Sequence, residues 1–283
     1  VSQRTGEAGA GGGGQGAPTG APAAPQSEVV TSPEPSPVER LLASSQGSAW
    51  YGLYMLEKKV GHARLWLRAT TPGELGALVI GTDAQLSLHV QGQTNTVTIR
   101  ETRFYDGRAP YGLQMTELSE AAEGVEVVRR VVRDGDALVL TTPGEQDPAQ
   151  RIAATAETAH SVLAMSPRDL KALTPGKTSK VSVFDWESLG DQVVAVTLKG
   201  MSILQRSGVT TPVAELEFQY MGTGLKGITL MGEDGVALRT TLGAGLVLKL
   251  EEEAVAKAQV VGLDVFASGV SVTRRLLAPA EHE

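Results

Sequence analysis

Paired segments of alternating apolar and polar residues, joined by short turns, run through most of this chain. Three such pairs are Trp50–Leu56 with Val60–Arg68, Gln85–Val90 with Thr94–Tyr105, and Val125–Arg133 with Ala137–Thr142. A period of two places successive side chains on opposite faces of a strand, and glycine in a turn supplies a positive φ. In Val60–Arg68, the residues Gly61, Ala63, Leu65 and Leu67 therefore share one face. Each pair predicts an antiparallel hairpin.

The same pattern resumes in the second half of the chain. Its strand-like segments are Val181–Phe184, Gln192–Met201, Val213–Tyr220, Gly227–Met231, Val236–Thr241 and Gly245–Leu250. Between the two runs, Ser166-Pro167-Arg168-Asp169 has the cap, proline and acidic residue of a helix start, and this helix would end before Pro175. Strands joined by turns, without alternating helices, indicate a mainly β fold. We expect an antiparallel curved sheet or open half-barrel with a few short helices.

Composition divides the chain into three parts. Residues 1–37 are mostly Gly, Ala, Pro, Ser and Gln, with too little apolar surface to offset the entropy of ordering them. We expect a disordered linker there, a β-rich domain over 38–260 with two sheet regions joined near 160–176, and a C-terminal linker over 261–283. Further short helices are expected at Ser36–Ser45 and Glu251–Ala258.

The residues needed for several kinds of chemistry are missing. The 283 residues include no cysteine and only four widely spaced histidines, which argues against thiol nucleophiles, disulfides and zinc sites. No serine lies in a G-x-S-x-G turn. The net charge of −7 without a basic block disfavours nucleic acid, and no apolar run has the roughly 18 residues of a membrane helix. We expect no catalytic residue, cofactor, metal or transmembrane segment.

Two motifs invite a chemical interpretation. Gly222-Thr223-Gly224-Leu225-Lys226-Gly227 matches the G-x-G-x-x-G dinucleotide loop, but a strand pattern follows it where that loop requires a helix. We interpret it as a hairpin turn. The acids Asp185, Glu187 and Asp191 lie near Trp186, an arrangement that would suit a hydrolase acting on a glycan. A solvated loop is the simpler interpretation of these acids.

Aromatic residues are few and gather on the first hairpin. Trp50, Tyr51, Tyr54 and Trp66 lie there, either lining a pocket or filling one end of the curved sheet. Packing in the core is the simpler of the two. As candidate ligand-binding residues we take Trp50, Tyr54, Trp66 and Trp186.

Several segments resemble a known family. Trp50-Tyr51-Gly52-Leu53-Tyr54 and the following Glu57–Ala63 resemble the W-x-G-x-Y … K-x-G-x-A hairpin in the N-terminal β-rich region of bacterial envelope transglutaminase-like proteins and related periplasmic domains of unknown function. Leu173–Gly176 before Val181–Asp185, and later Asp234–Arg239, resemble further segments of that region. Enzymes of that family carry a Cys-His-Asp core downstream. Because this chain has no cysteine, no catalytic residue carries over and we expect no enzyme.

This resemblance and the Gly/Ala/Pro leader imply a protein of the bacterial cell envelope or periplasm, with a lipid anchor upstream of Val1; a cytoplasmic protein with a GTG start is the alternative. We expect a non-catalytic accessory, binding or scaffold module whose partner is another protein or a downstream domain. One alternative is a carrier of a hydrophobic ligand in the half-barrel. The other is a hydrolase that uses the carboxylates of Asp185, Glu187 and Asp191.

Overall fold

The computed structural model describes residues 48–90, 93–108, 110–144, 150–164, 174–206, 208–258, 260 and 263–264. The strands of the first half are β1 (Ser48–Met55), β2 (Lys58–Ala69), β3 (Leu78–Val90), β4 (Gln93–Tyr105), β5 (Leu113–Ala122), β6 (Val125–Asp134), β7 (Ala137–Thr141) and β8 (Gln150–Ala153). Those of the second half are β9 (Thr178–Asp185), β10 (Gly190–Arg206), β11 (Val209–Tyr220), β12 (Lys226–Met231), β13 (Ala237–Leu242), β14 (Leu246–Glu251) and β15 (Leu263–Asp264). The described helical segments are α2 (Ala159–Ala164), α3 (Glu253–Ala256) and the 3-10 turn Gly243–Gly245.

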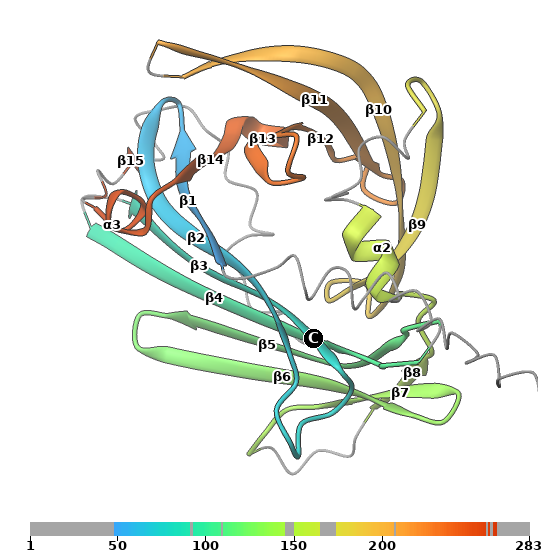
Figure 1. Ribbon diagram of the computed structural model, residues 1–283. Coiled ribbons are helices and arrows are strands. Elements are labelled where there is room, and N and C mark those ends of the chain that lie inside the picture. The colour runs from blue at the N-terminus through green and yellow to red at the C-terminus, as the bar shows by residue number, and fades with distance from the viewer. Residues whose placement is uncertain are drawn as a thin grey trace, which may run out of the picture. The chain divides into compact units, whose positions relative to one another are not determined.

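The two runs of strands form one sheet. Consecutive strands are antiparallel neighbours within each run, and β1 pairs with β14 to join the runs, in a register that extends from Trp50 opposite Glu251 to Met55 opposite Leu246. The strand order is therefore β8-β7-β6-β5-β4-β3-β2-β1-β14-β13-β12-β11-β10-β9. Within the described residues, β8 and β9 do not pair with each other. The result is a curved, unclosed sheet, as predicted (Figure 1).

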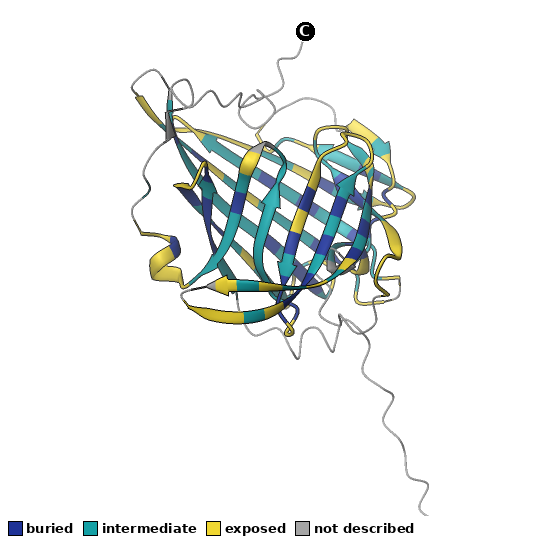
Figure 2. Cartoon of the chain, turned by 90° about the horizontal axis from the view of Figure 1, so that it is seen from above, coloured by how far each residue is buried: buried dark blue, intermediate teal, exposed yellow. Residues whose placement is uncertain are grey.

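Alternation along the strands gives the sheet an inner and an outer face. The buried and less buried stripes across the strands follow this alternation (Figure 2). Leu65 of β2 and Val183 of β9 line one cavity although many strands separate them in the sheet, so their face is the concave one. By register, Ala63, Leu65 and Leu67 lie on this side, and His62, Arg64 and Trp66 lie on the convex side. The face assignment from sequence is therefore confirmed.

The hairpins predicted from turn residues are present, with ends that shift by a few residues in most cases. The turn of the first hairpin is Leu56-Glu57, both at positive φ. Four strands or α-helices were not predicted: β5, β8, α2 and β15, the last of which lies within the segment 261–283 that was expected to be a linker. The helices expected at Ser36–Ser45 and after Ser166 lie outside the described residues. In the C-terminal part, β15 pairs in parallel with Leu88 and His89 of β3, beyond the point where β2 stops pairing.

The described helices are short, and none has the length and apolar character that a membrane-spanning helix requires. α3 packs outside the sheet against β1, β2 and β14, and α2 packs against β9. Because β9 is one of the two outer strands, α2 lies at the opening of the curved sheet (Figure 1). The unpredicted helix is thus the one that contributes to the cavity.

Candidate functional site

A cavity of about 470 Å³ lies on the concave side of the sheet. It is lined by Leu65, Ile80, Thr82, Glu101, Arg103, Val162, Val183, Phe184, Asp185, Trp186, Gln192 and Tyr220. These residues come from β2, β3 and β4, from β9, β10 and β11 with the β9–β10 turn, and from α2. A volume of this size with a mostly apolar lining and a few polar groups is typical of small-molecule sites.

Strand register explains why these side chains meet. Leu65 lies opposite Thr82, which lies opposite Glu101, so all three share one face of β2, β3 and β4. Ile80 lies opposite Arg103 on that same face. Partners that lie directly opposite in an antiparallel sheet point to the same side. One half of the sheet therefore contributes a continuous wall.

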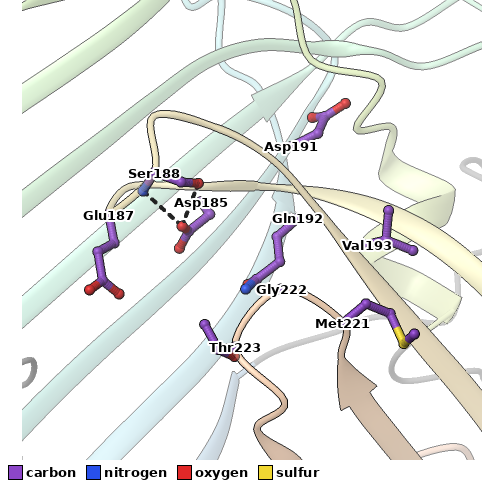
Figure 3. Close-up of a pocket in the computed structure, with 9 residues that line it drawn as sticks. All are labelled: Asp185, Glu187, Ser188, Asp191, Gln192, Val193, Met221, Gly222 and Thr223. Carbon is purple, nitrogen blue, oxygen red and sulfur yellow. Dashed lines mark hydrogen bonds between the residues drawn. The ribbon is translucent and has the colours of Figure 1, made fainter.

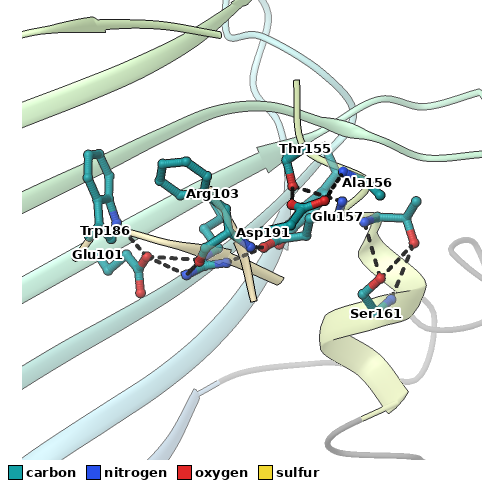
Figure 4. Close-up of polar contacts among 11 residues, drawn as sticks. Glu101, Arg103, Thr155, Ala156, Glu157, Ser161, Trp186 and Asp191 are labelled. Atoms are coloured by element: carbon teal, nitrogen blue, oxygen red, sulfur yellow. Dashed lines mark hydrogen bonds and ion pairs between the residues drawn. The ribbon is translucent and has the colours of Figure 1, made fainter. Parts of the chain in front are cut away.

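A buried polar cluster adjoins this cavity, whose lining includes two of its members, Glu101 and Arg103; its contacts are drawn in Figure 4. Glu157, whose side chain is fully buried, accepts hydrogen bonds from the Tyr105 hydroxyl at 2.5 Å, from the Phe184 N–H and from the Arg103 guanidinium. Arg103 also donates to Glu101 Oε1 at 2.9 Å and to the Phe184 carbonyl at 3.1 Å. Every charged group of this cluster thus has a partner, which buried charges require.

Burial and neighbouring charges shift the pKa values of Arg103 and Tyr105 in this cluster. Burial by itself lowers the pKa of the Arg103 guanidinium, but the carboxylates of Glu101 and Glu157 outweigh that effect and raise the pKa above its ordinary value. Burial, followed by the charge of Glu157, raises the pKa of the Tyr105 hydroxyl well above its usual range. The cluster therefore holds one cation between two carboxylates.

These side chains also bridge the opening of the sheet. Phe184 lies on the outer strand β9, and its N–H and carbonyl bond to Glu157 and Arg103 instead of to another strand. Trp186 donates its indole N–H to Glu101 at 2.9 Å. Asp191 accepts hydrogen bonds from the Thr155 hydroxyl and, at 2.8 Å, from the Ala156 N–H. Side-chain contacts thus replace strand pairing where the sheet does not close.

A second, more open hollow of about 890 Å³ adjoins the cavity, between the β9–β10 and β11–β12 turns (Figure 3). We call it the acidic mouth; it is lined by Asp185, Glu187, Ser188, Asp191, Gln192, Val193, Met221, Gly222 and Thr223. Asp185 accepts hydrogen bonds from the Ser188 N–H at 2.9 Å and hydroxyl at 2.7 Å. The structure thus brings together the three acids that the sequence singled out. Gly222–Leu225 form the turn between β11 and β12, as the hairpin interpretation predicts.

Of the four predicted ligand-binding aromatics, Trp186 lines the cavity. The other three lie on the convex face of the first hairpin. There Lys257 Nζ lies 4.3 Å from the centre of the Trp50 ring, Tyr54 donates its hydroxyl to Glu251 at 2.6 Å, and Trp66 donates its indole N–H to Asp83 at 3.0 Å. The four residues therefore do not form one site.

Most residues of the cavity lining were not among the predicted site residues. Val97, Ile99, Glu101, Arg103 and Tyr105 alternate along β4 and share its inner face. Two charged residues in an otherwise apolar or aromatic row were a usable signal, because charges on a buried face need partners. No comparable signal marks Leu65, Ile80 or Tyr220, which look like ordinary core residues.

The described residues include no group of three or more acidic or histidine side chains placed to hold a metal ion. One imidazole is nevertheless perturbed. His62 lies on the convex face of β2, 6.0 Å from the Trp50 ring centre, and its buried Nδ1 has no hydrogen-bond partner. Burial lowers the pKa of His62 below 6.5, and the charges of Lys257 and Lys59 lower it further.

This shift predicts a pH dependence of stability. As the pH falls, His62 takes up a proton near pH 6.5 in the unfolded state but only at lower pH in the folded state. The free energy of unfolding is therefore not affected by His62 above about pH 6.5, and it decreases as the pH falls from there toward the folded-state pKa. In His62→Gln, the free energy of unfolding should fall less between about pH 7.5 and pH 5.5 than in the wild type. Urea unfolding at both pH values measures the difference. Equal falls in the two proteins would contradict the assignment.

Comparison with known proteins shows a similarity in fold to solved structures. No family model matches the chain, and no curated protein matches it. A solved β-barrel-like protein of the domain of unknown function DUF1849 from Brucella abortus aligns over 72% of this chain and 95% of its own, with a TM-score of 0.53 and 10% identity. A DUF1089 family protein from Pseudomonas aeruginosa aligns over 62% of this chain and 87% of its own, with a TM-score of 0.33 and 12% identity. The resemblance to transglutaminase-like proteins stays a prediction. In its fold, the chain is similar to the β-barrel-like DUF1849 domain.

Proposed function

We propose that this protein is a non-catalytic binding module that holds the apolar part of a small ligand in the concave cavity. The observation that supports this most is the lining itself, in which seven apolar or aromatic side chains surround five polar ones. Leu65 is 38% exposed although it lies on the inner face. Covering such surface with a ligand is favourable by about 25 cal/mol per Å² of apolar area.

The cavity is also built to keep its shape. Arg103, Glu157 and Trp186 connect β4 and the segment before α2 to β9 and the β9–β10 turn. Binding is stronger when the site does not have to be ordered by the ligand. The contacts across the opening therefore favour a binding site over an incidental gap in packing.

The hydrolase alternative has less support. Asp185 holds the turn through Ser188, and Asp191 holds the segment before α2 through Thr155 and Ala156. Hydrogen bonds within the chain thus account for the positions of both carboxylates. We favour binding for this reason.

As part of the same proposal, the protein is located in the bacterial cell envelope and has a protein partner. One observation favours a partner: Met201, Ile203 and Val209 are each more than half exposed at the tip of the β10–β11 hairpin. This tip extends beyond Ala214, where β12 begins to pair with β11. Exposed apolar side chains on a projecting hairpin are typical of docking surfaces.

Binding can be tested with the neutral apolar fluorophore N-phenyl-1-naphthylamine. We expect saturable enhancement of its fluorescence with the wild-type protein. In Leu65→Asn, which puts an amide into the apolar wall, the dissociation constant should rise roughly tenfold because apolar contact is lost.

The matched control is Ile228→Asn. Ile228 is 41% exposed, a fraction similar to the 38% of Leu65. It lies on the convex face, opposite Glu217 and Thr241. Its substitution should leave the dissociation constant unchanged. Absence of saturable binding by the wild type, or equal effects of both substitutions, would reject the cavity as the site.

A further inference from the structure

We propose that the ligand of this cavity is an amphiphile whose polar end is a cation, with the apolar part in the cavity and the cation in the acidic mouth. This inference rests on the proposed function and specifies its ligand. It is carried by the continuity of an apolar cavity with a hollow that has negative charge and no described basic residue in its lining.

The two spaces meet at shared residues. Asp185 and Gln192 line both the cavity and the acidic mouth. On the cavity side of this junction, Trp186 and Tyr220 line the cavity. On the mouth side lie Asp191 and the β11–β12 turn (Figure 3). A ligand that fills the cavity therefore reaches the carboxylate of Asp185 at one end.

Neutral donors hold two aspartates of the mouth in place. Asp185 and Asp191 receive hydrogen bonds from the neutral groups of Ser188, Thr155 and Ala156. Such bonds orient a carboxylate without neutralising it. Among the described residues, neither aspartate is in an ion pair with Lys or Arg, in contrast to exposed acids elsewhere in the sheet, which pair with arginine.

The one cation that lines the cavity does not offset this charge. Arg103 lies between Glu101 and Glu157, and its guanidinium donates to both and to the Phe184 carbonyl. An anionic ligand would thus meet a guanidinium that is already paired, together with the negative charge of Asp185. Tyr220 lines the cavity, and its hydroxyl bonds to no other described residue, so it adds a neutral polar contact near the junction.

The test uses three probes with the same chain and different ends: decylammonium, decanol and decanoate. Each is titrated at pH 7 against the protein with bound N-phenyl-1-naphthylamine, and displacement gives the dissociation constant. We expect decylammonium to bind about tenfold more tightly than decanol, and decanoate to bind most weakly, because unlike charges attract in a partly solvated site.

The variant Asp185→Asn/Asp191→Asn keeps the size of both side chains and removes their charge. The measured quantity is the ratio of the dissociation constants for decylammonium and decanol within each protein, so a general change in the affinity of the cavity cancels. In this variant the two dissociation constants should become equal. The control Glu126→Gln/Glu233→Gln removes the same charge at exposed positions outside both linings and should keep the preference.

The outcomes separate the two proposals. If all three probes displace the fluorophore equally, or decanoate binds most tightly, the cavity binds ligands but the cationic class is wrong. If the control loses the preference as fully as Asp185→Asn/Asp191→Asn does, long-range net charge explains it and the mouth is rejected. If neither the fluorophore nor any probe binds, the proposed function itself fails.

Discussion

Replacing Glu157 with alanine is expected to lower the free energy of unfolding by about 3–5 kcal/mol, because it breaks a buried ion pair by removing one partner. The substitution leaves the Tyr105 hydroxyl, the Phe184 N–H and part of the Arg103 guanidinium without their acceptor. Unsatisfied buried donors each add to the loss. Urea unfolding followed by tryptophan fluorescence measures the change.

The control for this prediction is Glu117→Ala. Glu117 pairs with Arg130 on the outer face, where both side chains are partly exposed, and such pairs contribute about 0–1 kcal/mol. Native-state hydrogen exchange supplies a second measurement, because Glu157→Ala should speed exchange of the Phe184 N–H on the outer strand β9. Similar losses of stability in the two variants would mean that the bridge across the opening does not hold the sheet together.

The local structure of this fold could be read from the sequence because hairpins are encoded locally. Gly135 is at positive φ in the turn between β6 and β7, as the Asp134-Gly135-Asp136 pattern predicts. β5 was missed because Leu113–Ala122 contains Glu, Ser and Ala, which are weak strand formers. It forms because β4 and β6 pair with it on both sides. Tertiary pairing thus overrides local preference there.

The pairing of β1 with β14, which joins the two runs of strands, could not be predicted from the sequence. Tyr54 and Glu251 bond across 197 positions of chain, and no local pattern specifies that β1 pairs with β14. The cavity depends on this pairing, because it brings β2–β4 and β9–β11 to face each other. Trp186 could be predicted as a ligand-binding residue because it is an aromatic residue next to acidic ones in the sequence. The roles of Arg103 and Glu157 required knowledge of which strands face each other.

Replacing Gly61 with alanine is expected to cost about 3 kcal/mol or more of the free energy of unfolding. Gly61 is buried on β2, and a Cβ there would lie 1.9 Å from the Gln85 carbonyl oxygen and 3.0 Å from the Leu86 Cα of β3. The obstacle is backbone, so no rotamer change can relieve it. The strands must separate and lose hydrogen bonds where β2 continues the sheet from the β1–β14 junction.

Gly190→Ala is the matched control for Gly61→Ala, because Gly190 also lies in a strand and its nearest atom to an added Cβ is the Ser188 carbonyl oxygen at 3.9 Å. Thermal and urea unfolding should show a small change for Gly190→Ala, since alanine also restricts the unfolded chain. If Gly61→Ala unfolds at the same urea concentration as Gly190→Ala, the close approach of β2 and β3 at Gln85 is wrong.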